Sequence, residues 1–499
     1  MAGARVRRRA VRAEGRRDAL PGAAVMSTLV IDVGSSSVRV LLFDNAAEPI
    51  ADASVRQLIR FSRHAAADAE HLRKLTEQCI DQILTHPAAA DIAAVGMATF
   101  VGNLLGVDAE GAPVTPILTY ADMRSAPDAE TLAQSVSMQA AHARTGCRIH
   151  PAYHPAKLAW MRRTNPDQFA RAAQWTDFAT YCYRVWFGRD VPCSYSIASW
   201  SGLLNRESLT WDTAWLETLG LEASALPRLA DYDEVYCGLS SAYAARWPNL
   251  NSVPFYLAVG DGAAANIGSG GSTPDHPVLT VGTTAALRVV TPEPGRVPLG
   301  LWAYRIDAKR HLIGGATSEG GSVYAWATAA LKLDSAGLDN ALLARSPGSH
   351  GLTVLPLFAG ERSPNYRADA TGTIHGLRLD TAPLDILHAL IEAVALRLRV
   401  IFDLMGRPGE FVLAGGGALS QSPAWTQITA DALGIPLYLV DQAEPTGRGV
   451  ALLCGLTHNG DPIDAPSVRA IIRPRPGIAD TVAALLDRQK TLYAALYGE

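Results

Sequence analysis

The chain has 499 residues, of which 48% are hydrophobic and only 18% are charged. This length suits two to four domains with complete hydrophobic cores, and the low charged share excludes a globally disordered chain. Lys and Arg number 44 against 48 Asp and Glu, a net charge of -4, which leaves no basic surplus to neutralise a nucleic-acid backbone. We therefore expect a folded protein without a nucleic-acid partner.

Cysteine spacing and hydropathy indicate the compartment. The six cysteines are scattered, with neither the paired spacing of a zinc site nor the density of a disulfide framework, which favours a reducing cytosol. The most apolar helical segment, residues 384–405, carries Glu392, Arg397 and Arg399. A membrane span needs about 18 uninterrupted apolar residues, so we expect a cytoplasmic protein without a membrane partner.

Residues 1–25 differ from the rest of the chain. Seven arginines lie between Arg5 and Arg17, without apolar periodicity, and a strand pattern begins within a few residues of Met26. We expect a disordered or non-native extension, that is, a flexible tail or an over-extended start. A basic arm for an acidic partner and a transit peptide are the alternatives.

Two strand–turn–strand patterns open the two halves of the chain. Residues 28–34 are β-branched and apolar up to a small-residue turn, and residues 38–43 resume the apolar pattern. Residues 278–281 run in the same way into Gly282-Thr283-Thr284 and on to residues 285–290. Both patterns predict a β-hairpin, so the chain is expected to be internally duplicated.

Helix and strand patterns alternate between the hairpins and after them. Residues 66–86 predict a helix, and residues 92–97 and 104–107 predict strands. In the second half, apolar residues from Leu387 to Ile401 recur at steps of four and three, the stripe of a long amphipathic helix.

A strand and a capped helix follow this long helix. Residues 411–414 predict a strand that runs into a glycine triplet, residues 415–417. After it, Ser422 is expected as an N-cap, Pro423 as a first-turn proline and Gly434 as a C-terminal stop.

The mixture of strands and helices in two halves predicts an α/β protein with two domains and a cleft between them. The boundary is expected near residues 268–277, which are rich in Gly, Ser and Pro. The predicted units are an N-terminal domain over residues 26–270, a C-terminal domain over 271–457, and a tail over 458–499 without a functional signal.

The turns of both hairpins suit phosphate binding. Gly34-Ser35-Ser36 and Gly282-Thr283-Thr284 contain only small residues, which leave backbone N–H groups free and let a phosphate approach closely. Asp32, two residues before the first turn, could hold a divalent cation directly or through water. A single such turn usually just connects strands, but two at equivalent places, followed by a glycine triplet, are less easily explained by chance.

Longer motifs accompany the hairpins. Leu355–Pro364 has the pattern LPxxxGERxP, Pro155–Trp160 has the pattern PxKLxW, and glycines recur at 314–315 and 320–321. With these motifs the chain resembles the FGGY family of carbohydrate kinases over roughly residues 28–457, and within it the gluconate kinases. The resemblance implies two actin-like (ribonuclease H-like) ATPase domains with an interdomain cleft, and the phosphorylation of a small sugar or sugar acid with ATP and Mg²⁺.

The resemblance also implies residue roles. Residues 32–36 are similar to the family's first phosphate motif, residues 280–284 to the second, and residues 412–418 with Ser420 to the adenosine motif. Asp32 becomes the expected Mg²⁺ ligand. The implied phosphate and ATP contacts are Gly34, Ser35, Ser36, Gly282, Thr283, Gly320, Gly415, Gly416, Gly417 and Ser420.

A kinase of this kind needs a carboxylate that accepts the proton of the attacking hydroxyl. In the family this Asp lies in a Gly-Asp segment at the end of the first domain, and residues 259–264, VGDGAA, are similar to it. The resemblance therefore implies Asp261 as the general base. The structural alternative is a turn Asp before Gly.

Sugar contacts are implied in the first domain. Tyr120–Arg124 is similar to the family's Trp-x-Asp-x-Arg element, in which Asp122 would accept from sugar hydroxyls and Arg124 would position them or pair with Asp122. A salt-bridged loop is the alternative. Residues 145–153 are similar to a segment of the gluconate kinases, where binding and structural roles stay equally open for Arg148, His150 and Tyr153. The implied substrate contacts are Thr99, Asp122, Arg124, His150 and Tyr153.

One departure concerns the substrate. Xylulose and gluconate kinases of the family commonly carry a Met-His pair near the end of an early strand, where this chain has Val101-Gly102. The whole-chain likeness still favours gluconate kinases, and Arg124, Arg148, His150 and His154 offer positive potential for a carboxylate ligand. We expect D-gluconate to be phosphorylated to 6-phosphogluconate. A xylulokinase-like pentulose kinase or a polyol kinase is the alternative.

Two other classes of protein are further alternatives. Loss of Asp261 or of the glycine loops would favour a non-catalytic sensor of ATP or sugar, and neither is lost. An actin-like or chaperone-like ATPase is disfavoured by the Gly-Glu-Arg-Ser-Pro segment. We further expect closure of the two halves by a hinge near residues 268–277, while the sequence leaves open whether the protein is a homodimer.

Overall fold

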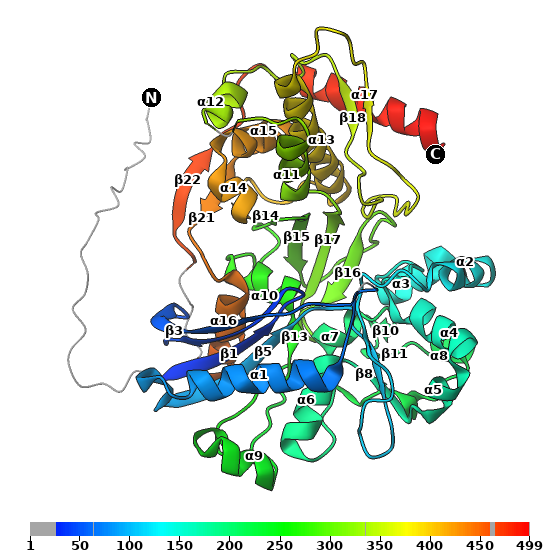
Figure 1. The fold of residues 1–499 in the computed structure, drawn as a ribbon, viewed down its shortest axis with the longest axis vertical. Coiled ribbons are helices and arrows are strands. Elements are labelled where there is room, and N and C mark those ends of the chain that lie inside the picture. The colour runs from blue at the N-terminus through cyan, green and yellow to red at the C-terminus, as the bar shows by residue number, and fades with distance from the viewer. Residues whose placement is uncertain (1–25, 63, 335, 460–464, 499) are drawn as a thin grey trace, which may run out of the picture.

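The computed structural model describes residues 26–62, 64–334, 336–459 and 465–498 (Figure 1). The expectation for residues 1–25 lies outside these ranges. Two β-sheets organise the chain, one in each half, and helices cover their faces.

The N-terminal sheet has five strands in the order β13-β5-β1-β2-β3. β1 (Ser27–Val33) and β2 (Ser37–Phe43) pair antiparallel, which confirms the first predicted hairpin, and β3 (Pro49–Leu58) pairs antiparallel with β2. On the other side, β5 (Ile92–Thr99) runs parallel to β1, and β13 (Val259–Gly260) runs parallel to β5. Three parallel strands therefore end at one edge of this sheet.

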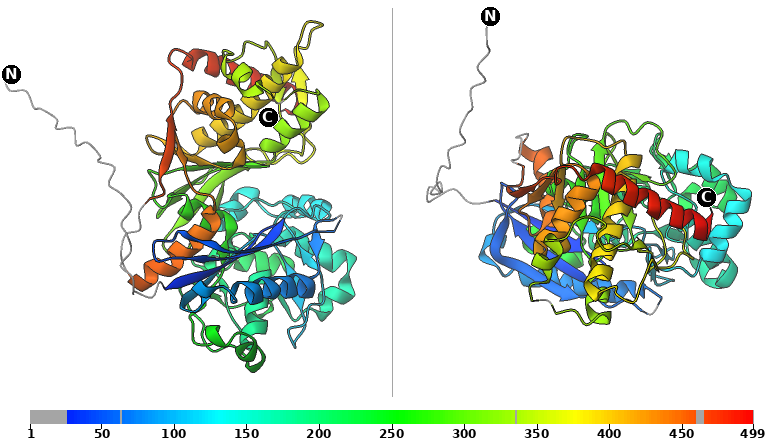
Figure 2. Two further views of the ribbon diagram at one scale, coloured as in Figure 1. Left: turned by 60° about the vertical axis from the view of Figure 1, so that its left-hand side comes forward. Right: turned by 90° about the horizontal axis from the view of Figure 1, so that it is seen from above.

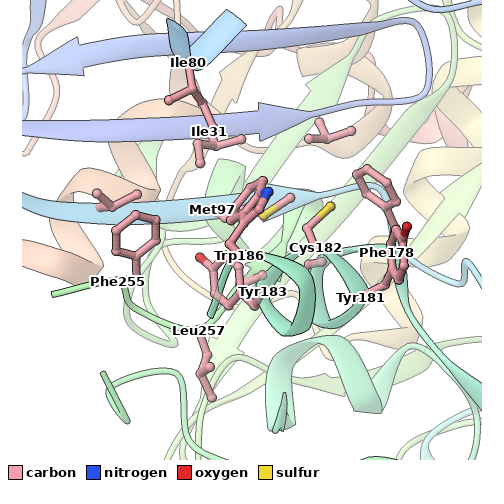
Figure 3. Packing of buried hydrophobic residues seen from close by; sticks show 14 of the residues in the cluster. Ile31, Ile80, Met97, Phe178, Tyr181, Cys182, Tyr183, Trp186, Phe255 and Leu257 are labelled. Carbon is pink, nitrogen blue, oxygen red and sulfur yellow. The ribbon is translucent and has the colours of Figure 1, made fainter. Parts of the chain in front are cut away.

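Both faces of β1 are buried. Ile31 belongs to a core that includes Ile80 of α1 (Ala69–Ile83), and Figure 3 shows it together with Met97 of β5 and Trp186. Val30 belongs to a separate core formed with α16 (Pro445–Asn459). Because successive strand side chains point to opposite faces, a strand covered on both sides has an uninterrupted apolar run, which in β1 extends from Leu29 to Ile31.

Helix α1 is shorter than the predicted helix over residues 66–86. The side chain of Asp68 accepts a hydrogen bond from His71 N at 2.6 Å and fixes the start of the helix at Ala69. Residues 66–67 instead form β4 (Ala66–Ala67), which pairs with β7 (Ile117–Leu118). The apolar periodicity therefore located this helix, and the Asp cap set its first residue.

The rest of the N-terminal half surrounds this sheet with short elements. They are β6 (Leu105–Val107), α2 (Ala126–Ser135), α3 (Met138–Thr145), α4 (His154–Thr164), α5 (Pro166–Arg171), β8 (Gln174–Thr176), α6 (Phe178–Phe187), β9 (Cys193–Ser194), α7 (Tyr195–Ser199), β10 (Leu204–Asn205), β11 (Thr210–Trp211), α8 (Thr213–Leu219), β12 (Leu229–Ala230), α9 (Ser241–Arg246) and α10 (Asp261–Gly268).

The C-terminal sheet repeats the arrangement of the first. Its hairpin of β14 (Val278–Val281) and β15 (Ala285–Thr291) is antiparallel, and β17 (His311–Thr317) pairs antiparallel with β15. On the other side, β20 (Val412–Gly415) runs parallel to β14, and β21 (Leu437–Val440) runs parallel to β20. This is the same order and direction as in the N-terminal sheet, which confirms the internal duplication. The strands are, in spatial order, β16 (Trp302–Arg305), β17 (His311–Thr317), β15 (Ala285–Thr291), β14 (Val278–Val281), β20 (Val412–Gly415), β21 (Leu437–Val440) and β22 (Val468–Ile472).

Helices complete the C-terminal half. The predicted long helix is α13 (Pro383–Leu404). Ser422 caps α15 by accepting from Trp425 N at 3.0 Å, and Gly434, at φ +67°, ends it, both as predicted. The remaining elements are α11 (Gly321–Ala330), α12 (Leu338–Leu343), β18 (Thr353–Leu355), β19 (Thr373–His375), α14 (Gly417–Gln421), α15 (Pro423–Leu433) and α17 (Ala479–Tyr497).

The segment after residue 458, expected as a tail, is integrated into this half. β22 pairs antiparallel with β21, and Val482, Leu485 and Leu486 of α17 are buried in the C-terminal core. Tyr493 of α17 donates to Glu361 Oε2 at 2.6 Å, and Arg397 also donates to Glu361. The tail therefore anchors the Gly-Glu-Arg-Ser-Pro loop.

Two glycine-lined helices join the halves. A Cβ at Gly268 of α10 would lie 1.8 Å from Pro445 O, and one at Gly449 of α16 would lie 1.8 Å from Ala264 O, so the two helix backbones are in contact. Although α16 follows the C-terminal strand β21, it packs on the N-terminal sheet (Figure 2). The chain therefore passes between the sheets three times, and residues 268–277, the expected hinge, are the first of these passages.

Candidate active site

Asp32, Thr99 and Asp261 meet at the edge of the N-terminal sheet where three parallel strands end. Asp32 is in register with Ala98, and Thr99 is in register with Gly260, directly before Asp261. Ligands of open α/β sheets bind at the carboxyl ends of parallel strands. The two carboxylates, chosen from sequence motifs 229 residues apart (261 − 32), are therefore brought to one place.

Asp32 is a buried carboxylate with one partner. Arg39 Nη2 donates to its Oδ2 at 2.5 Å, and Arg39 Nη1 donates to Glu444 Oε2 at 2.5 Å. Burial raises the pKa of Asp32 to about 6, Arg39 opposes this rise, and the charges of Asp261 and Glu444 add to it. A carboxylate whose charge is destabilised by burial and by like charges is stabilised by a cation, so its surroundings suit the Mg²⁺ role expected for Asp32.

Asp261 begins α10 with one oxygen engaged. Its Oδ1 accepts from Gly262 N at 2.7 Å, and among the described residues nothing donates to Oδ2. Burial raises its pKa, against the Gly262 hydrogen bond and the charge of Arg288. A carboxylate with a raised pKa and an uncommitted oxygen has the chemistry of a general base.

The second phosphate hairpin is open at its turn and supported from behind. A Cβ at Gly282 would meet no atom within 4 Å, so ligand atoms can approach this turn. Gly282 O accepts from Gly321 N at 2.7 Å, which brings the start of α11 against the hairpin. A Cβ at Gly320 would lie 2.7 Å from the carbonyl carbon of Thr284, so this close approach requires glycine.

The glycine triplet lies beside this hairpin. Thr280 of β14 is in register with Gly415, the last residue of β20. Gly416 has φ +96°, and a Cβ there would lie 2.4 Å from Val281 O, so glycine is required on both counts. Gly417 and Ser420 are exposed on α14. The residues of this half that we expect to contact the phosphates and the adenosine therefore lie around one open edge of the C-terminal sheet. Such an edge suits a nucleotide.

The first phosphate hairpin belongs to the other sheet. Gly34 N donates to Ser37 O at 3.0 Å and closes the turn, which leaves Ser35 and Ser36 exposed. The turn follows Asp32 directly, so the expected cation ligand and the first phosphate contacts come from one hairpin.

The expected sugar contacts are less open than the phosphate contacts. Arg124 donates from Nε to Asp122 Oδ1 at 2.9 Å and from Nη2 to Oδ2 at 2.5 Å, and its guanidinium lies 4.4 Å from the Trp160 ring centroid. The pair is therefore a formed salt bridge, as in the structural alternative. Thr99 is fully buried, with its hydroxyl 3.5 Å from Phe100 O.

The positive wall expected from the sequence is largely neutral, which corrects that argument. Burial, with the charge of Lys157, lowers the pKa of both His150 and His154 to about 3, and Arg124 is paired with Asp122. Of the four groups invoked, Arg148 alone keeps a charge without an ion-pair partner among the described residues. The physical reason is that burial disfavours the charged form of a histidine.

Tyr153 and Gly102 have structural explanations. The hydroxyls of Tyr153 and Tyr304 lie 2.6 Å apart, so Tyr153 joins its half to β16 of the other.

Gly102, at the position of the missing family His, has φ +66°, and a Cβ there would lie 3.3 Å from Tyr120 Cβ. This backbone conformation disfavours any larger side chain at residue 102.

Sequence reasoning missed two arginines at this edge. Arg39 pairs with Asp32, and Arg288 of β15 lies close enough to Asp261 to affect its pKa. Arg288 could have been noticed in the sequence, because it is the one charged residue in the apolar run 285–290. Charged residues in such runs are rarely buried without a reason.

A cavity of about 1000 Å³ lies between the two halves. Residues of α2 and His150 line it on one side, and Tyr366 and Tyr493 line it on the other. His150 is the one expected sugar residue in its lining, and Asp261 is not part of it. The cavity therefore opens beside the candidate site rather than at the expected base.

A second cluster of polar residues is away from this edge. His350 Nε2 lies 2.8 Å from Glu392 Oε2, and His388 Nε2 lies 3.2 Å from Glu392 Oε1. The Nδ1 atoms of both rings accept hydrogen bonds, from Leu352 N and Arg345 Nε. The Nε2 atoms of both rings therefore face Glu392, and His350 Nε2 forms a hydrogen bond with it.

No described helix combines the length and hydropathy that crossing a membrane requires.

Comparisons with known proteins agree with this geometry. Family models for the N-terminal and C-terminal domains of the FGGY family of carbohydrate kinases match residues 27–268 and 278–458. A gluconokinase of Bacillus subtilis (strain 168) is 25% identical over 460 residues, covering 88% of this chain and 89% of that protein. Glycerol kinase 1 of Pseudomonas aeruginosa is 28% identical over 450 residues, covering 86% and 89%.

Solved structures share the fold. A gluconate kinase from Lactobacillus acidophilus superposes with a TM-score of 0.88 at 23% identity, covering 95% of this chain and 98% of that one. A ligand-bound xylulose kinase from the same organism gives the same TM-score, identity and coverage. These likenesses confirm the expected two-domain α/β fold. Since the two family models together span most of the sequence, the chain belongs to the FGGY family of carbohydrate kinases, ATP-dependent enzymes that phosphorylate an alcohol group of a small sugar.

Proposed function

We propose that the protein is a sugar-acid kinase that phosphorylates D-gluconate to 6-phosphogluconate, with Asp261 as the general base. The observation that carries the chemistry is the position of Asp261 at the strand edge, next to Asp32, with a raised pKa and one uncommitted oxygen. A base placed there can accept the proton of a hydroxyl as that hydroxyl attacks.

In the proposed reaction the substrate hydroxyl oxygen forms a bond to the γ-phosphorus of ATP, and the bond from that phosphorus to the β–γ bridging oxygen breaks. The hydroxyl proton passes to Asp261. Backbone N–H groups of the turns at residues 34–36 and 282–284 bind and orient the phosphates. Asp32 would hold Mg²⁺, which would neutralise phosphate charge there, and Arg39 keeps Asp32 ionised and oriented.

Two observations support an acid as substrate. The similarity to the Bacillus subtilis gluconokinase extends over most of both chains. In addition, Arg148 makes no ion pair with a described carboxylate, and its guanidinium lies 5.0 Å from the Tyr366 ring centroid. An unpaired guanidinium at a sugar site suits a carboxylate better than a neutral polyol.

The second candidate is a xylulokinase-like pentulose kinase. The neutral state of His150 and His154 and the pairing of Arg124 favour it, because they remove most of the positive charge expected from the N-terminal half. The structural likeness to a xylulose kinase is equal to that with a gluconate kinase.

A coupled assay of ADP release tests the proposal. One preparation is given gluconate, xylulose, ribulose and glycerol in turn, and kcat/KM is compared. We expect gluconate to exceed every neutral acceptor by about tenfold or more, the discrimination available when a buried charge is matched or left unpaired. A preference of similar size for xylulose would establish the second candidate instead.

A further inference from the structure

Arg288 is a half-buried cation with two donor atoms that lack a partner among the described residues. It lies in the middle of β15 between the buried residues Leu287 and Val289. Its Nε and Nη1 are shielded from solvent, and neither has a hydrogen-bond partner among the described residues. Buried guanidinium groups are normally paired because removal from water is costly. The unmet donors therefore call for a ligand.

The side chain reaches the loop that carries Asp261. A Cβ at Gly262 would lie 3.7 Å from Arg288 Nε on one side and 3.2 Å from Trp200 Cη2 on the other. Trp200 Nε1 is also buried without a partner. Donors from both halves of the molecule thus flank the segment that holds the expected base, and both lack an acceptor.

The charge around Arg288 is positive in excess. Asp261 is the carboxylate that acts on it, while Arg362 of the Gly-Glu-Arg-Ser-Pro loop adds positive charge. Arg362 and Arg148 in turn act on His150. Within the described residues, none of these three arginines forms an ion pair, in contrast to Arg124 and Arg39, which do.

This excess of positive charge lies on the side of Asp261 where the sugar is expected to bind, away from the phosphates. Arg288 follows the turn residue Thr284 by four positions, about 13 Å at roughly 3.3 Å per residue. Its strand partners are Val278 and Gly314, well away from the phosphate turn. Its charged neighbour Arg362 acts electrostatically on both His150 and Tyr366, which line the cavity between the halves. Contact with the substrate's far end is therefore better supported than contact with the transferred phosphoryl group.

We propose that Arg288 binds the carboxylate of the acid substrate, so that the C-terminal half, and not the wall around Asp122 and Arg124, selects an acid over a neutral polyol. The planar guanidinium offers two parallel N–H groups to a carboxylate. This inference rests on the proposed sugar-acid function. Burial lowers the pKa of Arg288 to about 10, so the group stays charged at neutral pH.

This arrangement couples recognition to domain closure. The acid end of the substrate would meet Arg288 of the C-terminal half, while its reacting hydroxyl meets Asp261 of the N-terminal half. Only a substrate that carries both the carboxylate and the reacting hydroxyl would contact both halves at once. Selectivity for the acid would therefore appear in kcat/KM.

The test compares gluconate with glucitol, which differs in carrying a hydroxymethyl group in place of the carboxylate. We expect Arg288→Gln to lower the ratio of kcat/KM for gluconate to that for glucitol by about 100-fold, the loss of a charge-assisted pair. Arg288→Lys keeps the positive charge but loses the two parallel N–H groups of the guanidinium, so it should recover part of this ratio. The control is Arg305→Gln on β16, because Arg305 is also buried but donates to Arg206 O and Ala308 O; it should leave the ratio near that of the wild type.

The outcomes separate this inference from the proposed function. If Arg288→Gln lowers the rates on gluconate and glucitol in parallel, Arg288 acts on the phosphoryl group or on Asp261, and the inference is wrong while the function stands. If the wild type phosphorylates another sugar acid in preference to gluconate, the same ratio is measured for that acid and its alditol. If the wild type phosphorylates no sugar acid, both the function and the inference are wrong.

Discussion

The hydroxyls of Tyr153 and Tyr304 lie 2.6 Å apart and join the two halves of the molecule. Both side chains are buried, and Tyr304 stacks on Trp200 with ring centroids 3.6 Å apart. Tyr304 also acts electrostatically on Arg288. The contact between the halves therefore adjoins the arginine that we propose binds the substrate.

Tyr153→Phe tests whether this tyrosine is structural or binds the sugar. The change leaves Tyr304 with a buried hydroxyl that lacks its partner, so we expect the free energy of unfolding to fall by about 1–3 kcal/mol. Because the Tyr153 hydroxyl is already engaged, KM for the sugar should change little. Urea unfolding and steady-state kinetics on the same preparation measure the two quantities.

The matched control is Tyr195→Phe, a partly buried tyrosine of the first half outside this contact. A rise in KM of about tenfold for Tyr153→Phe, with unfolding unchanged, would contradict the structural role and restore the substrate role implied by the family resemblance.

Glu392→Gln tests the hydrogen-bonded cluster with His350 and His388. Despite its burial, the hydrogen bonds and charges of these histidines lower the pKa of Glu392 from 4.5 to about 2. Since the folded value lies below the unfolded one, the carboxylate stabilises the fold above about pH 4.5, and this contribution is lost as pH falls towards 2. We expect the variant to be less stable than wild type by about 3 kcal/mol at pH 7.

Urea unfolding at pH 7 and at successively lower pH values measures this difference, and Glu410→Gln, at an exposed position, is the control. The gap between Glu392→Gln and wild type should narrow below pH 4.5. A stability difference between Glu392→Gln and wild type that stays constant down to about pH 2 would show that the charge of the carboxylate does not contribute to stability.

Local sequence patterns were sufficient for the duplicated hairpins and the capped helix. The turns at residues 34–36 and 282–284 and the cap at Ser422 depend on small residues and neighbours close in sequence, so composition and spacing predict them. The start of α1 was placed too early because one Asp cap overrides the apolar period of the residues around it. The role of α17 was missed because its contacts with Glu361 are long-range.

Charge states at the site could not be read from residue types. His150 and His154 look cationic in the sequence, and only the packing around them shows that burial keeps them neutral. Arg288 looks like a strand residue, and only the folded chain brings it to Asp261. The position of Asp261, by contrast, followed from a motif, because it depends on a short segment between a strand and a helix.

Asp261 as the general base is the central proposal, and the kinetics of Asp261→Asn test it. The amide keeps the shape and can still accept from Gly262 N, but it does not take up the hydroxyl proton. Asp108→Asn is the control, because Asp108 is a turn residue whose Oδ1 accepts from Glu110 N at 3.1 Å and Ala112 N at 2.8 Å. We expect Asp261→Asn to lower kcat by about 10²–10⁴-fold with KM for ATP nearly unchanged, and Asp108→Asn to keep its activity. Turnover above about a tenth of the wild-type value in Asp261→Asn would show that Asp261 is a turn residue and not the base.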